Sequence, residues 1–141
     1  ILLWLAEREG RFMPGNQPAR ALVQQWLMIQ MANVGPMLGQ YTHFNIVPEG
    51  TADYARARYR AIAEKLYRAL ESRLSHSEYL AGGDYSIADM ATQPWAYYLE
   101  REAFSDAAER TRKGASDADL DRFFNRTASV PVADFSAVRN M

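Results

Sequence analysis

The 141-residue sequence contains no cysteine and only two histidines, and these two scarcities exclude much chemistry. Without cysteine, the chain has no disulfide, no thiolate metal ligand and no cysteine nucleophile. Two histidines without cysteine make no metal-binding motif, so we expect no metal site. The absence of cysteine fits a reducing compartment, and we expect a cytoplasmic protein.

The sequence also lacks a long apolar run and an excess of charge of either sign. No apolar stretch approaches the roughly 18 residues that a membrane-spanning helix needs. Sixteen basic residues face 17 acidic ones, which leaves a formal net charge of −1. That balance favours neither a nucleic-acid surface nor a polybasic membrane surface. We therefore expect no nucleic acid and no membrane among the partners.

The residues that are present predict one folded, all-α domain. The hydrophobic fraction of 48% is too high for a disordered chain. Apolar residues recur at helical spacing, and no stretch shows the alternation of a strand. The spacing predicts four main helices and a weaker last one, separated by loops rich in glycine and proline: 1–9, 18–45, 53–74, 86–102 and 116–129.

Two positions in these helices carry specific local expectations. Gly35-Pro36 interrupts the second helix, and proline removes one backbone hydrogen bond and clashes one turn back, so a kink or break is expected there. Asp53 is placed to cap the following helix, because a carboxylate can accept bonds from free amides at a helix start. A last helix containing Leu120, Phe123 and Phe124 is expected before Val130-Pro131-Val132.

Ser86 and Asp89 form a capping-box pattern ahead of an apolar run. The Ser86 hydroxyl can accept a bond from the Asp89 amide, and the Asp89 carboxylate can reach back to the Ser86 amide. Such a cap is worth about 0.5–2 kcal/mol. Its chemistry is that of a helix start, and we interpret Asp89 as a buried cap rather than as a catalytic acid.

The box stands inside a longer pattern. The segment Tyr79-Leu80-Ala81-Gly82-Gly83-Asp84-Tyr85-Ser86-Ile87-Ala88-Asp89-Met90-Ala91 resembles the capping-box signature of the C-terminal domain of glutathione transferases. Four further segments resemble the bacterial nu class of that family: Gln25–Gln40, His43-Phe44-Asn45, Tyr54-Ala55 and Arg58-Tyr59. That class is related to the yeast nitrogen-regulation prion protein. The resemblance covers residues 1–95 strongly and weakens beyond Trp95, where Thr127 and Val130 depart from the family pattern.

The resemblance implies a division of the chain. Residues 1–10 resemble the last helix of a thioredoxin-like domain, 11–17 the linker, and 18–141 the all-helical C-terminal domain of the glutathione transferase type. On this interpretation the chain is a fragment whose upstream part is missing. In the family that upstream domain binds glutathione, the co-substrate, and carries the residue that activates its thiol, so we expect no catalytic residue in this chain. We also expect the isolated 141 residues to be inactive.

The family's C-terminal domain supplies the wall for the second substrate and much of the dimer surface. Carried onto this sequence, the resemblance implies that five residues contact the acceptor: Met37, Gln40, Tyr41, Phe44 and Trp95. Plain core packing is the alternative for the large apolar members of that set. A homodimer is implied through the first two helices, with contributions from Gln24, Gln25, Met28, Met31 and Ala32.

Two functions remain open on the sequence. The first is the acceptor-binding and dimerisation part of a glutathione transferase or glutathione-dependent disulfide reductase, acting on a small electrophile or a disulfide. The second is a non-catalytic protein-interaction or assembly domain of the same fold, which the divergent segment after Trp95 favours. His43 lacks an acidic partner at a telling spacing, and we interpret it as a helix-end or core histidine. We interpret His76 as a solvated loop residue, and Arg56 and Arg58 as part of a solvated helix face.

Overall fold

The computed structural model of the chain describes residues 1–48 and 50–97. Within these ranges the chain is a bundle of helices, α1 (Leu2–Glu9), α2 (Gln17–Ile29), a five-residue π-helical turn η1 (Gln30–Val34), α3 (Gly35–Ile46), α4 (Asp53–Leu74) and α5 (Ile87–Tyr97). No strand is formed in the described ranges, where a lone bridge between Tyr79 and Gly82 closes a turn. The expected all-α architecture is therefore confirmed. The expected helix around Leu120 lies outside the described residues.

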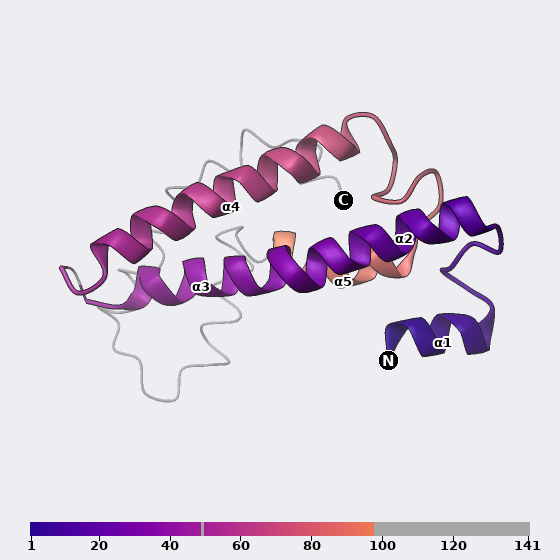
Figure 1. Cartoon of the computed structure of the whole chain (residues 1–141), viewed down its shortest axis with the longest axis horizontal. Coiled ribbons are helices and arrows are strands. Elements are labelled where there is room, and N and C mark those ends of the chain that lie inside the picture. Colours follow the sequence, from indigo (N-terminus) through magenta and orange to yellow (C-terminus); the bar gives the residue numbers. More distant parts are fainter. Residues whose placement is uncertain (49, 98–141) are drawn as a thin grey trace.

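Helices α2, η1 and α3 form one long rod that is not broken at Pro36 (Figure 1). The Gly35 amide donates to the Gln30 carbonyl, five residues back, instead of four. This wider turn stands directly before the proline, where a regular α-turn would clash with the ring. The expected interruption is thus a π turn, and the helix continues through it.

Helix α4 runs back along α3 as a helical hairpin (Figure 1). Ala63, Tyr67 and Leu70 are the buried residues of α4, and they meet Val34, Leu38 and Tyr41 in one apolar cluster. The expectation for Asp53 is wrong, because Ala52 occupies the N-cap position of α4 and no side chain caps the helix there. The Asp53 carboxylate instead pairs with Arg56 at 2.7 Å, one turn further along α4.

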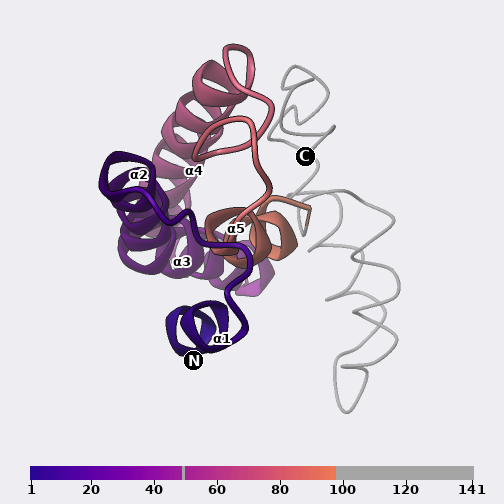
Figure 2. The same cartoon turned by 90° about the vertical axis from the view of Figure 1, so that its right-hand side faces the viewer.

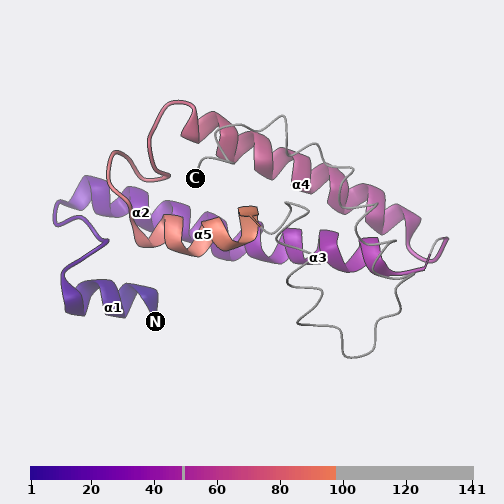
Figure 3. The ribbon, with the colours of Figure 1, turned by 180° about the vertical axis from the view of Figure 1, so that it is seen from behind.

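Helices α5 and α1 complete the bundle, with α5 beside the rod between α4 and α1 (Figures 2 and 3). Ile87 and Ala88 of α5 are buried against Val23 and Leu27 of α2, and Ala6 of α1 joins the same cluster. Gly10 ends α1 in the left-handed conformation, with φ of 62°, as the sequence suggested. None of the described helices is long and apolar enough to cross a membrane.

The start of α5 is fixed by a fully buried carboxylate. Asp89 accepts the Ser86 amide at 2.9 Å and the Ser86 hydroxyl at 2.8 Å, and its other oxygen accepts the Leu80 amide at 2.8 Å. The Ser86 hydroxyl oxygen accepts the Ala88 amide rather than that of Asp89. The capping box is therefore present, with one half altered, and it also anchors the loop before α5.

Removing the Asp89 carboxylate should destabilise the fold strongly. In Asp89→Ala the buried amides of Leu80 and Ser86 lose their acceptor, which should lower the free energy of unfolding by about 3 kcal/mol. Asp84→Ala, an exposed neighbour, should change it by less than about 0.5 kcal/mol. Urea unfolding measures the stability of both variants. Equal unfolding midpoints would show that the buried hydrogen bonds of Asp89 contribute nothing to the free energy of unfolding.

Candidate functional site

Trp95 is the expected acceptor residue whose position the structure explains most fully. Its indole lies against two glycines on α3, where a methyl group added at Gly39 would stand 3.7 Å from Trp95 Cζ3. One added at Gly35 would stand 3.5 Å from Trp95 Cε2 and 3.2 Å from Gln30 Nε2. The ring remains 38% exposed. The two glycines thus form a flat seat that fixes the indole and leaves part of it open; we call this surface the Trp95 seat.

Met37, Gln40 and Phe44 lie on another flank of α3. Successive residues of an α-helix are rotated by about 100°, so Met37 and Gly39 point in directions roughly 160° apart. Gln40 and Phe44 fall on the Met37 flank, one and two turns further along. Phe44 stacks on Tyr59 of α4, with ring centroids 5.3 Å apart and planes 10° from parallel. The structure therefore does not bring these three residues to the same surface as Trp95.

Tyr41, the remaining candidate, is in the core. Its side chain is 1% exposed and belongs to the cluster between α3 and α4. As folded, its phenol does not reach the surface of the described part of the molecule. The five candidate residues therefore do not share one surface: Trp95 lies on its seat, Tyr41 lies in the core, and the other three lie on the opposite flank of α3.

Arg56 and the two histidines have local partners, so the solvated position expected for Arg56 is wrong. Arg56 donates to the Phe44 and Val47 carbonyls as well as to Asp53, so it ties α4 to the end of α3. The His43 ring meets the edge of Phe44, and His76 Nδ1 lies 2.9 Å from the Ser72 carbonyl. Over residues 1–48 and 50–97, no three histidine or carboxylate side chains come together as metal ligands.

Two features at the Trp95 seat escaped the sequence reasoning. The sequence analysis names Gly35 only beside Pro36 and gives Gly39 no role, although their four-residue spacing puts both on one face of the helix. Buried Gln30 Oε1 and Thr92 Oγ1 have no hydrogen-bond partner among the residues that the structure describes, and they belong to η1 and α5, which contact each other. Tyr67 secures the far end of α5 by donating to the Ala96 carbonyl at 2.9 Å.

Comparison with known protein families gives a match over most of the chain. The model of the family described as Glutathione S-transferase, C-terminal domain, matches residues 34–131. Among curated proteins, the disulfide-bond oxidoreductase YfcG of Escherichia coli is 46% identical over 102 residues, which is 72% of this chain. The disulfide-bond oxidoreductase YghU of the same organism is 34% identical over 110 residues, or 77% of this chain.

Solved structures give a similar result. A Burkholderia graminis glutathione transferase with two glutathione molecules bound per subunit matches 99% of this chain, with a TM-score of 0.67 and 34% identity. A glutathione transferase family member from Pseudomonas fluorescens, also with two glutathione molecules bound, matches 99% with a TM-score of 0.67 and 31% identity. The chain spans only 56% and 59% of those two proteins, and 47% and 38% of YfcG and YghU.

The two glycines of the Trp95 seat should respond differently to alanine. Gly39→Ala puts a methyl group in ordinary contact with the indole and should stabilise the helix by about 0.5–1 kcal/mol. Gly35→Ala crowds the Gln30 amide at 3.2 Å and should gain less or lose stability. Thermal unfolding compares the two variants, and a larger gain for Gly35→Ala would contradict the tight seat.

Proposed function

The chain belongs to the glutathione S-transferase C-terminal domain family, and we propose that it is the acceptor-binding and dimer-forming part of a glutathione-dependent enzyme. The reaction we favour is reduction of a small disulfide. Support comes from the two relatives named disulfide-bond oxidoreductases and from two neighbours solved with two glutathione molecules bound. We also propose a place in the bacterial nu class, on the resemblance of the segment Gln25–Gln40 to that class.

The composition of the chain constrains the chemistry. These 141 residues contain no cysteine, so they supply no thiol for exchange with a disulfide. A thiolate of one glutathione would attack one sulfur of the substrate and release the first product thiol. A second glutathione thiol would then resolve the mixed disulfide, which yields oxidised glutathione and the second thiol. The role proposed for this chain is to bind and orient the disulfide.

The Trp95 seat is the observation that carries this proposal. Helix α5 contacts both α3 and α1, the helix that resembles the end of a thioredoxin-like domain (Figure 2). A glutathione-binding domain attached at α1 would therefore lie on the α5 side of the rod. Trp95 offers a fixed, partly open apolar surface on that side, and the unpartnered polar atoms of Gln30 and Thr92 stand at the same helix contact. Met37, Gln40 and Phe44 then form a second candidate surface on the opposite flank.

Turnover by the intact protein tests the proposal and separates the two flanks. The intact protein should reduce 2-hydroxyethyl disulfide with glutathione, whereas the isolated 141-residue chain should not. Loss of the aromatic surface in Trp95→Leu should raise KM for the disulfide about tenfold. KM for glutathione should stay nearly constant in that variant.

Met37→Leu is the matched control on the opposite flank of α3. It should leave both KM values nearly unchanged, since a volume-conserving apolar exchange keeps the packing. A disulfide KM that rises in Met37→Leu but not in Trp95→Leu would place the acceptor on the other flank. No glutathione-dependent turnover, together with a stable complex with another protein, would favour the alternative of a non-catalytic assembly domain.

We also propose that two copies associate through one exposed face of the rod. Met28 and Met31 are 57% and 63% exposed, and they follow Gln24 at helical spacing. Exposed methionines of this kind suit an adaptable apolar interface.

A charge placed in that face should separate the dimer. Met28→Lys combined with Met31→Lys should shift the intact protein from twice the subunit mass to the subunit mass, because like charges would be buried against each other. Glu78→Lys, a charge change in an exposed loop, should leave the mass unchanged. Sedimentation equilibrium measures the masses, and a dimer that survives the double substitution would move the interface elsewhere.

A further inference from the structure

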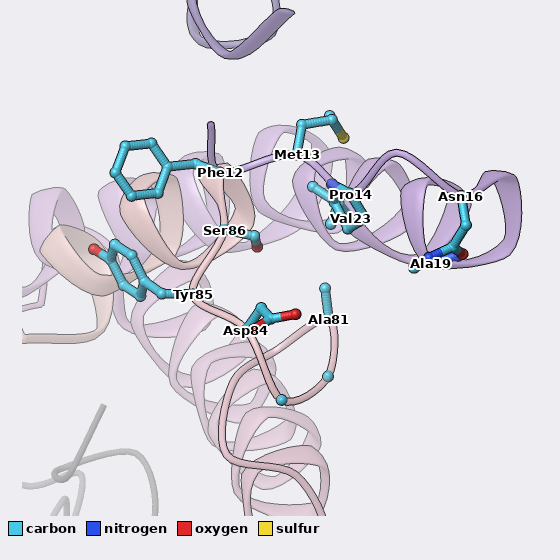
Figure 4. A pocket seen from close by; sticks show the side chains of 12 residues that line it. Phe12, Met13, Pro14, Asn16, Ala19, Val23, Ala81, Asp84, Tyr85 and Ser86 are labelled. Carbon is cyan, nitrogen blue, oxygen red and sulfur yellow. The ribbon is translucent and has the colours of Figure 1, made fainter. Parts of the chain in front are cut away.

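A cavity lies at the start of α5, the end of that helix away from Trp95. It has a volume of about 380 Å³ and opens between the linker after α1, the first turn of α2 and the loop before α5 (Figure 4). None of the five acceptor candidates lines it. The volume falls in the range of small-molecule sites, which is about 300–1,000 Å³.

The walls of this linker pocket are mostly apolar, and they are held in place from several sides. Pro14 and Val23 face Ala81 across the opening, and Met13 lies behind them (Figure 4). At the rim, Phe12 meets Tyr85 edge-on, with centroids 6.2 Å apart. Phe12 has a φ of 62°, which is rare for a bulky residue, and its carbonyl accepts the Ile87 amide at 3.1 Å. These contacts build the pocket before any ligand binds.

The two helix starts beside the pocket offer few donors to an anion. Helix N-termini ordinarily favour negative charge through their free amides. Here Asn16 Oδ1 accepts the Ala19 amide at 2.9 Å, and the Ser86 hydroxyl accepts the Ala88 amide at 3.3 Å. The Ile87 amide is bound to the linker carbonyl. These three amides at the helix starts are therefore already engaged.

Asp84 gives the pocket its charge. It is the one carboxylate among the lining residues, which include no lysine, arginine or histidine. Figure 4 shows its carboxylate on the side of the pocket where Ala81 lies. Within the described ranges, the Asp84 carboxylate forms no ion pair. An apolar cavity with a single unpaired carboxylate at its edge is complementary to a cation with an apolar body.

We propose that the linker pocket binds a small organic monocation, of the class of primary arylalkylammonium ions. The ammonium group pairs with the Asp84 carboxylate, and the apolar body fills the space between Pro14, Val23 and Ala81. The site stands on its own contacts, so it is independent of the reaction proposed at the Trp95 seat.

Titration of the intact protein with two probes of opposite charge tests this site. 2-Phenylethylammonium should bind saturably and shift the amide signals of Ala19 and Asp84 in NMR spectra, whereas 3-phenylpropionate should not. Asp84→Asn should weaken the ammonium probe about tenfold, the equivalent of about 1.4 kcal/mol. Glu78→Gln, an exposed carboxylate that does not line the pocket, should bind the probe like the unchanged protein.

A filling substitution gives an independent reading. Ala19→Leu adds apolar volume from the first turn of α2 and should abolish binding of the ammonium probe. If that variant does not fold, the comparison of Asp84→Asn with Glu78→Gln still decides, because both positions are exposed. Equal affinity in Asp84→Asn, equal binding of both probes, or no saturable binding at millimolar concentration would each overturn the proposal.

Discussion

The hydrogen bonds to the Asp89 carboxylate are the interaction on which the rest of the described structure depends. They join the loop at Leu80 to the first turn of α5, although the two segments are separated in sequence by nine residues. The Ile87 amide then binds the Phe12 carbonyl, which fastens the linker to the same point. Because α5 carries Trp95 at its other end, the capping network also sets where the acceptor surface lies. A buried carboxylate with three donors is costly to disturb, since each donor would be left without a partner.

The sequence predicted much of this arrangement because the signals were local. Gly10 as a helix end, the amphipathic α4 and the capping box each follow from spacing within one or two turns. Sequence reasoning failed where a long-range contact decided the outcome. The π turn before Pro36 lies in contact with α5. Asp53 pairs with Arg56, and that arginine also binds carbonyls at the end of α3.

The site shows the same division. The choice of Trp95 rested on a family resemblance, while the reason for its position is the paired glycines on a different helix. Treating the five candidates as one wall ignored the rotation of about 100° between helical residues, which separates Met37 from Gly39. Burial of Tyr41 depends on α4, which reaches it from more than twenty residues away. The family fold alone does not decide between catalysis and assembly, since function resides in particular surfaces.

Hydrogen exchange at the amides of Leu80, Ser86 and Ile87 in the intact protein tests the central role of Asp89 most directly. If the capping network holds loop, linker and helix together, these three amides exchange only through global unfolding, as slowly as the best-protected amides of α5. Gly83 and Asp84, in the exposed part of the same loop, exchange quickly in either case. Exchange of the Leu80, Ser86 and Ile87 amides at the rate of that exposed part would contradict the role given to Asp89.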